Sequence, residues 1–176
     1  MSVMAGVEAT VRAGGRANKY VSSTDDDWYT PAWVFERLGL TFDLDPCSPA
    51  GGLSWLPARQ HYALPGDGLA LPWRGRVWLN PPYGGRTAAW VGKMATHRNG
   101  IALVNALTEA RWFHQAVAGC DLAAFYTGRI YFARPDGTLS RGRPSMFLAW
   151  GEECAEALRV ANLGVCVRAA LSGVTE

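Results

Sequence analysis

The sequence is poor in the residues that build disulfide frameworks and structural metal sites. Its 176 residues include only four cysteines and three histidines, and no two cysteines have the Cys-x-x-Cys spacing of zinc sites. The cysteines are scattered among apolar neighbours, at Cys47, Cys120, Cys154 and Cys166. This pattern argues against a disulfide-stapled protein, and we expect reduced cysteines and no bound metal.

Long apolar runs and a strong net charge are also absent. No stretch reaches 18 apolar residues and no charged-then-apolar leader is present, so we expect a cytoplasmic protein without a membrane span. With 49% hydrophobic and 18% charged residues, the composition is that of a globular protein. The formal net charge is only +2, so affinity for a polyanion has to come from local clusters of charge.

Hydrophobic periodicity divides the chain into an arm and one domain. Residues 1–26 lack periodicity and are predicted to be a flexible arm, whereas residues 27–176 are predicted to form a single domain. Within that domain helices and strands alternate, which predicts an α/β layered sheet. Helices are expected at 31–38, 86–97, 109–118 and 152–162, and strands at 41–45, 76–79, 101–105, 122–127, 129–133, 146–150 and 164–169. Residues 129–132 and 145–150 are expected to pair as an antiparallel ribbon at the sheet edge.

The most informative motif is the tetrapeptide Asn80-Pro81-Pro82-Tyr83, which follows an apolar run. The Asn80 side chain offers one carbonyl acceptor, and the Pro81 backbone carbonyl offers a second whose direction is fixed by the Pro82 ring. Two rigid acceptors can hold both hydrogens of one amino group. Tyr83 adds an aromatic face on which a base can stack. The motif therefore predicts a site for a planar ring that carries an amino group.

Such a site has a chemical purpose. The exocyclic amino group of adenine is nearly planar because its lone pair is delocalised into the ring, and this makes the nitrogen a poor nucleophile. Acceptors at Asn80 and Pro81 favour a pyramidal nitrogen and stabilise the positive charge that develops on it. A Pro-Pro turn that merely ends a strand is the alternative interpretation, so the surrounding sequence has to decide.

Two upstream segments and a turn bear on that decision. Thr30-Pro31 is predicted to begin a helix, with Thr30 as N-cap and Pro31 at the first helical position, where a carboxylate can also be bound. Asp45 ends a short alternating strand. It is therefore expected at the carboxyl end of that strand, where open α/β sheets bind ligands. Asp67 stands in an Asp-Gly turn. Each of these features has an ordinary structural explanation, a helix cap or a turn, when it is taken alone.

In this order, the motifs resemble those of the phage-type DNA N6-adenine methyltransferases, which use S-adenosylmethionine (SAM). The similarity extends from about Trp28 to Trp150 and includes Gly128-Arg129-Ile130-Tyr131-Phe132. It implies a three-layer, Rossmann-like sheet, mostly parallel with an antiparallel edge. It also implies that Thr30, Pro31, Asp45 and Asp67 contact SAM, while Asn80, Pro81, Pro82 and Tyr83 hold an adenine flipped out of DNA. The Gly-x-Gly loop common in SAM enzymes is missing, so the role of Asp45 stays open.

A basic segment is the candidate DNA contact. Arg129, Arg134, Arg141 and Arg143 lie in or beside one predicted loop, from which they can reach DNA phosphates. A solvated hairpin loop without a partner explains the same residues equally well.

Methyltransferases that act on three other amino groups share parts of this sequence pattern. RNA adenine and protein glutamine also carry a planar, conjugated NH2 group, and a cytosine-N4 enzyme would more often have Ser in place of Asn80. A nucleic-acid-binding module that keeps the fold without activity is the alternative from another class. The intact tetrapeptide argues against that module.

Overall fold

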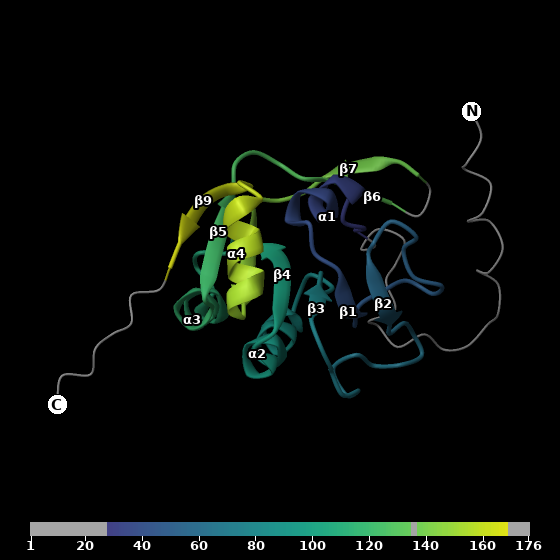
Figure 1. The fold of residues 1–176 in the computed structure, drawn as a ribbon. Helices are drawn as coiled ribbons and strands as arrows, with labels where there is room; N and C mark the ends of the chain where they lie inside the picture. The colour runs from purple at the N-terminus through teal and green to yellow at the C-terminus, as the bar shows by residue number, and fades with distance from the viewer. Residues whose placement is uncertain (1–27, 135–136, 169–176) are drawn as a thin grey trace.

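The structure, a computed structural model, describes residues 28–134 and 137–168 (Figure 1), so the predicted arm 1–26 lies outside the described residues. The described helices are α1 (Ala32–Leu38), α2 (Thr87–His97), α3 (Arg111–Gly119) and α4 (Glu152–Val160). The described strands are β1 (Phe42–Asp45), β2 (Ala58–His61), β3 (Val77–Leu79), β4 (Gly100–Asn105), β5 (Leu122–Tyr126), β6 (Tyr131–Ala133), β7 (Leu139–Arg141), β8 (Ser145–Trp150) and β9 (Gly164–Val167).

Seven of these strands form one sheet in the order β2-β1-β3-β4-β8-β5-β9. Strands β2, β1, β3 and β4 pair in parallel, β8 runs antiparallel to both β4 and β5, and β9 runs antiparallel to β5. Five strands therefore point one way, because β5 has the direction of β4. The predicted α/β sheet, parallel at its core with an antiparallel part, is confirmed.

Two apolar clusters lie on the two faces of this sheet and make three layers. On one face, side chains of α1 and α4 pack with Trp78, which sits edge-on to Phe35 at 4.8 Å and to Phe42 at 5.5 Å between ring centroids. On the other face, side chains of α2 and α3 pack with the neighbours of Trp78, Val77 and Leu79. Strand β3 alternates between the two clusters because successive side chains point to opposite faces.

The predicted ribbon of residues 129–132 with 145–150 is wrong. Strand β8 lies inside the sheet, between β4 and β5, while β6 pairs with β7 in a separate two-stranded hairpin. The physical reason is burial, since all six side chains of β8 are buried and such a strand needs a neighbour on each side. The β6–β7 hairpin can be followed beside α1 in Figure 1.

Two strands were not expected from the sequence. Strand β2, with the sequence ARQH, lies in the segment expected to be a loop and pairs with β1 at the sheet edge. Strand β7 lies in the predicted arginine-rich loop. Both are short and polar, so neither carries the apolar alternation that marks a strand. Among the described residues, no helix is long and apolar enough to cross a membrane.

Candidate functional site

The carboxyl ends of β1 and β3 bring the two halves of the predicted site together. These strands are parallel neighbours, with Leu44 opposite Val77. Asp45 is the last residue of β1, and Asn80 is the first residue after β3. Both residues therefore lie at the carboxyl ends of parallel strands, where open α/β sheets bind ligands.

The Asn80 amide is held in one orientation by two hydrogen bonds. Its Nδ2 donates to the backbone carbonyl of Trp28 at 2.6 Å, and its Oδ1 accepts from the Tyr83 hydroxyl at 3.2 Å. The Trp28 carbonyl can only accept, so it selects the side on which the amide nitrogen lies. Burial of the hydroxyl raises the pKa of Tyr83, which keeps this donor protonated. The acceptor expected of Asn80 is thus oriented toward Tyr83.

The start of α2 holds the tetrapeptide loop. The Thr87 hydroxyl donates to the Pro82 carbonyl at 3.2 Å and accepts from the Gly84 amide at 3.1 Å. Gly84 has φ +128, a conformation that favours glycine. Pro81 is buried, whereas Pro82 is exposed. The loop is therefore tied back to the helix immediately after Tyr83.

Asp45 is a buried carboxylate. It is 4% exposed, and its Oδ1 accepts from the Cys47 amide at 3.0 Å. Burial raises its pKa from 3.8 to about 6, and the hydrogen bond from Cys47 opposes this only in part. A buried carboxyl group whose pKa is raised by desolvation is typical of a functional site.

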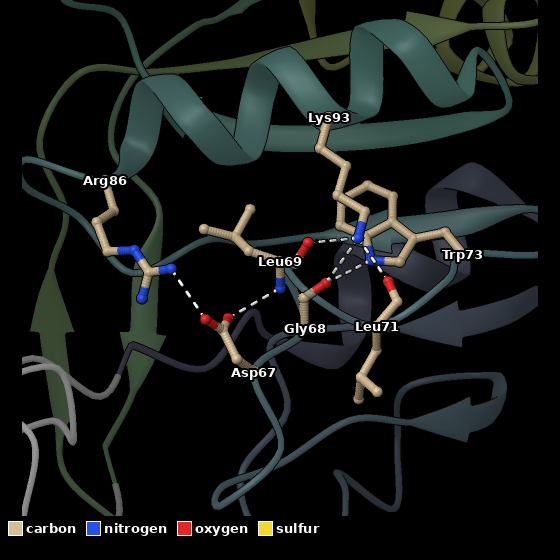
Figure 2. Close-up of polar contacts among 7 residues, drawn as sticks. All are labelled: Asp67, Gly68, Leu69, Leu71, Trp73, Arg86 and Lys93. Atoms are coloured by element: carbon tan, nitrogen blue, oxygen red, sulfur yellow. Dashed lines mark hydrogen bonds and ion pairs between the residues drawn. The ribbon is translucent and has the colours of Figure 1, made fainter.

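Asp67 lies on a loop that contacts Arg86, the N-cap residue of α2, and Lys93 within α2, as Figure 2 shows. Its Oδ2 forms an ion pair with Arg86 at 3.0 Å, and its Oδ1 accepts from the Leu69 amide at 2.9 Å. The hydrogen bond from Arg86 holds the pKa of Asp67 below its usual range. Because Arg86 stands between Tyr83 and α2, this ion pair connects the tetrapeptide loop to the Asp67 loop.

Lys93, which no sequence motif indicated, organises the same loop. Its Nζ donates to the carbonyls of Gly68, Leu69 and Leu71 at 3.1, 2.8 and 2.5 Å (Figure 2). The ammonium group has three hydrogens, so the three carbonyls use all of them. It also lies 4.8 Å from the centre of the Trp73 ring. Its partners are 22 to 25 residues away, so no local pattern signals this role.

Both aspartates lie close enough to Cys47 to act on its thiol. Burial, followed by the charges of Asp45 and Asp67, raises the pKa of the Cys47 thiol, which places both carboxylates near it. The loops also touch directly, since a Cβ at Gly68 would overlap the carbonyl oxygen of Pro46. The structure thus brings Asp45, Asp67 and the start of α2 together.

The predicted capping role of Thr30 is wrong, although its position is informative. Pro31, in an extended conformation, is the N-cap of α1, and no side chain caps the helix. Thr30 is 1% exposed, and its Oγ1 is a buried atom with no hydrogen-bond partner. Its carbonyl accepts from Trp55 Nε1 at 2.8 Å. A buried hydroxyl without a partner is rare in folded proteins.

Comparison with known proteins decides the family. A family model described as DNA N-6-adenine-methyltransferase (Dam) matches residues 17–152. The chain belongs to this family. No curated protein and no solved structure matches it. The resemblance seen in the motifs is thereby confirmed, together with the methyltransferase fold and the activity on adenine N6 in DNA that define the family.

The four arginines expected to bind DNA lie in three different settings in this DNA adenine methyltransferase. Arg141 and Arg143 are exposed, and Arg134 stacks on Trp28 with its guanidinium carbon 5.5 Å from the ring centre. Arg129 is half-buried, and its Nη1 is shielded from solvent without a hydrogen-bond partner. The hairpin therefore presents Arg141 and Arg143 more openly than Arg129.

The apolar part of the hairpin surface was not expected from the sequence. Tyr131 is 52% exposed and Leu139 is 67% exposed. Tyr131 pairs with Arg141 and Ala133 pairs with Leu139, so these side chains share one face of the hairpin, while Phe132 is buried on the other. Within residues 28–134 and 137–168, no three His, Cys, Asp or Glu side chains are grouped to hold a metal ion.

Proposed function

We propose that this family member uses SAM to methylate N6 of an adenine that is flipped out of DNA onto the 80–83 loop. The observation that carries the proposal is the Asn80 amide, which is fixed by Trp28 with its oxygen toward Tyr83. Asn80 Oδ1 and the Pro81 carbonyl accept from the adenine amino group, and Pro82 keeps the loop extended. The Tyr83 ring stacks on the base.

These acceptors raise the reactivity of the amino nitrogen. They favour the form in which the lone pair is no longer delocalised into the ring, and they stabilise the positive charge that forms as the nitrogen is alkylated. SAM supplies an electrophilic methyl group when it is bound. The Tyr83 hydroxyl, which donates to Asn80 Oδ1 in the free protein, has to yield this acceptor to the base.

The residues proposed to hold SAM fit its functional groups. The buried Thr30 hydroxyl lacks a partner and precedes Pro31 at the start of α1, which suits the carboxylate of the methionine moiety. Asp45 suits an ammonium or ribose hydroxyl group, because either partner stabilises its ionised form. Asp67, on the loop organised by Lys93, suits the adenine moiety.

A single assay separates this function from its rivals. Purified protein should be given methyl-labelled SAM with DNA, RNA of the same sequence, or protein, and the modified residue identified by mass spectrometry after digestion. We expect N6-methyladenine in DNA. Label found only in RNA, only in protein or only as N4-methylcytosine would identify one of the other amino substrates, and absence of SAM binding by calorimetry would favour a silent binding module.

Asp45→Asn should stabilise the SAM-free protein while weakening SAM binding. Because the folded pKa of about 6 exceeds the ordinary value of 3.8, the folded state holds the proton more tightly, and stability falls as pH rises through this range. Above pH 6 the cost is roughly 3 kcal/mol, at about 1.4 kcal/mol per pKa unit. Urea unfolding should show a gain for Asp45→Asn at pH 8 that vanishes near pH 3.5.

The control for this variant is Asp43→Asn, on the same strand. Asp43 forms an ion pair with Arg59 and accepts a hydrogen bond from the Arg76 amide. Its replacement should leave SAM affinity unchanged. An equal stability gain for Asp45→Asn at pH 8 and at pH 3.5 would show that burial of the charge is not the cause.

Replacement of both Arg141 and Arg143 by alanine should weaken DNA binding evenly across sequences. If each arginine contacts a phosphate, the slope of log K against log salt falls by about one unit for each of these phosphate contacts that is removed. The value of kcat at saturating DNA should change little. The matched control is Arg159→Ala/Arg168→Ala, which removes the same charge from α4 and from the residue that follows β9. Equal salt slopes for the two double variants would move the DNA surface away from the hairpin.

A further inference from the structure

The segment of residues 28–30 connects three parts of the site. The Trp28 carbonyl accepts from Asn80 Nδ2 at 2.6 Å. Tyr29 forms two backbone hydrogen bonds with Ala133 of β6, at 2.9 and 3.0 Å. The Thr30 carbonyl accepts from Trp55 Nε1 at 2.8 Å. The 28–30 segment is therefore bonded to the tetrapeptide loop, to the β6–β7 hairpin and to the loop after β1.

The Trp28 side chain anchors this segment on the hairpin. Its ring packs edge-on against Phe132, with 5.8 Å between centroids and an interplanar angle of 81°. The Arg134 guanidinium carbon lies over the same ring, 5.5 Å from its centre. Phe132 is 1% exposed and belongs to the core cluster, so the Trp28 ring packs against a side chain that is itself held in the core. The position of the Trp28 carbonyl thus depends on how the ring sits on β6.

The bond from Asn80 to Trp28 decides the polarity of the active amide. An Asn side chain is nearly symmetric in shape, but one end donates and the other accepts. If the amide turned over, it would present NH2 to the amino group of the substrate, and two donors would face each other. The Trp28 carbonyl, an acceptor only, prevents this reversal because it has to face Nδ2.

We propose that Trp28 is a positioning residue for methyl transfer. Its carbonyl keeps Asn80 Oδ1 directed at the base, and its ring ties that carbonyl to the β6–β7 hairpin. If Arg141 and Arg143 bind phosphates as proposed, contact of the hairpin with DNA is thereby coupled to the orientation of the acceptor that activates the amino group. The inference rests on the proposed role of Asn80 in binding the adenine amino group.

Trp28→Ala in the full-length protein should lower kcat while sparing binding. We expect a loss of about tenfold in kcat, with the Kd for SAM within about twofold of the native value, because the change acts on the barrier and not on cofactor contacts. Trp28→Phe retains an aromatic edge for Phe132 and should recover most of the activity. If Trp28→Ala fails to fold, Trp28→Leu, which keeps an apolar side chain but no aromatic ring, takes its place and should show the same loss of kcat. Wild-type kcat in Trp28→Ala would overturn the proposal.

A double-mutant cycle with Asn80→Asp separates positioning from a general structural effect. Aspartate presents an acceptor in either orientation, so it cannot be turned the wrong way, although its second oxygen is unfavourable against the Trp28 carbonyl. We expect Asn80→Asp to be active but weakened. Adding Trp28→Ala should then cost nothing further, and interacting residues of this kind are non-additive.

Each other outcome of the cycle contradicts the proposal. The same tenfold loss from Trp28→Ala in both backgrounds would show that Trp28 acts on stability or on the hairpin alone. A folded but inactive Asn80→Asp would show that an acceptor of free orientation is not sufficient. Failure of the proposed function itself is distinct, because then the unmodified protein would not methylate DNA.

Discussion

Asn80→Ala should lower kcat on DNA at least about a hundredfold, the loss typical for removal of one preorganised polar group that stabilises charge in a transition state. The variant loses the acceptor directed at the amino group, and no neighbouring side chain in the described loop replaces it. SAM affinity should be preserved, since Asn80 faces Tyr83 and Trp28 rather than the Asp45 and Asp67 loops. Single-turnover methylation with calorimetry of SAM binding measures both quantities.

Two variants of Tyr83 provide the control for this loop. Tyr83→Phe removes only the hydroxyl that bonds to Asn80 Oδ1 and keeps the ring, so its activity should stay within a few fold of the native value. Tyr83→Ala removes the stacking surface, worth about 1–3 kcal/mol for a base, and should be far less active. Near-native turnover by Asn80→Ala would remove the acceptor from the mechanism.

The position of the candidate tetrapeptide site could be predicted from the sequence because its parts are contiguous. Asn80 to Tyr83 directly follow a buried strand, and the position of Asp45 at the end of a neighbouring strand follows from period-two alternation. Parallel pairing of these strands then brings the two ends together. Local pattern and sheet geometry were sufficient to place these residues of the candidate site.

The remaining part depends on contacts between distant segments. Trp28 and Asn80 are separated by 52 residues, and nothing in either local sequence indicates a backbone carbonyl as the partner. Strand β8 was misplaced for a related reason: its apolar run fixes its burial but not its neighbours, which come from residues far away along the chain. The unpartnered Thr30 hydroxyl is visible only once the packing around it is known.

Gly68→Ala should disrupt the Asp67 loop and with it SAM binding. A Cβ at this position would overlap the Pro46 carbonyl oxygen and lie 2.9 Å from Cη2 of Trp90. Neither neighbour can move easily. The first is a backbone carbonyl, that of Pro46 next to Asp45, and the second is the Trp90 ring, which is buried and stacked on Trp73. The loop has to move instead, which breaks the bonds from Lys93 and Trp73 to the Gly68 carbonyl.

The expected cost of this extra methyl group is about 1–3 kcal/mol of unfolding free energy, as for other overpacked cores. SAM affinity should fall well beyond this loss of stability, because Asp45 and Asp67 lie on the two segments that are forced apart. Gly85→Ala is the matched control, since a Cβ there meets no atom within 4 Å. Urea unfolding and SAM titration of the two variants measure both effects. A Gly68→Ala protein as stable and as competent in SAM binding as Gly85→Ala would mean that the contact between these loops does not shape the cofactor site.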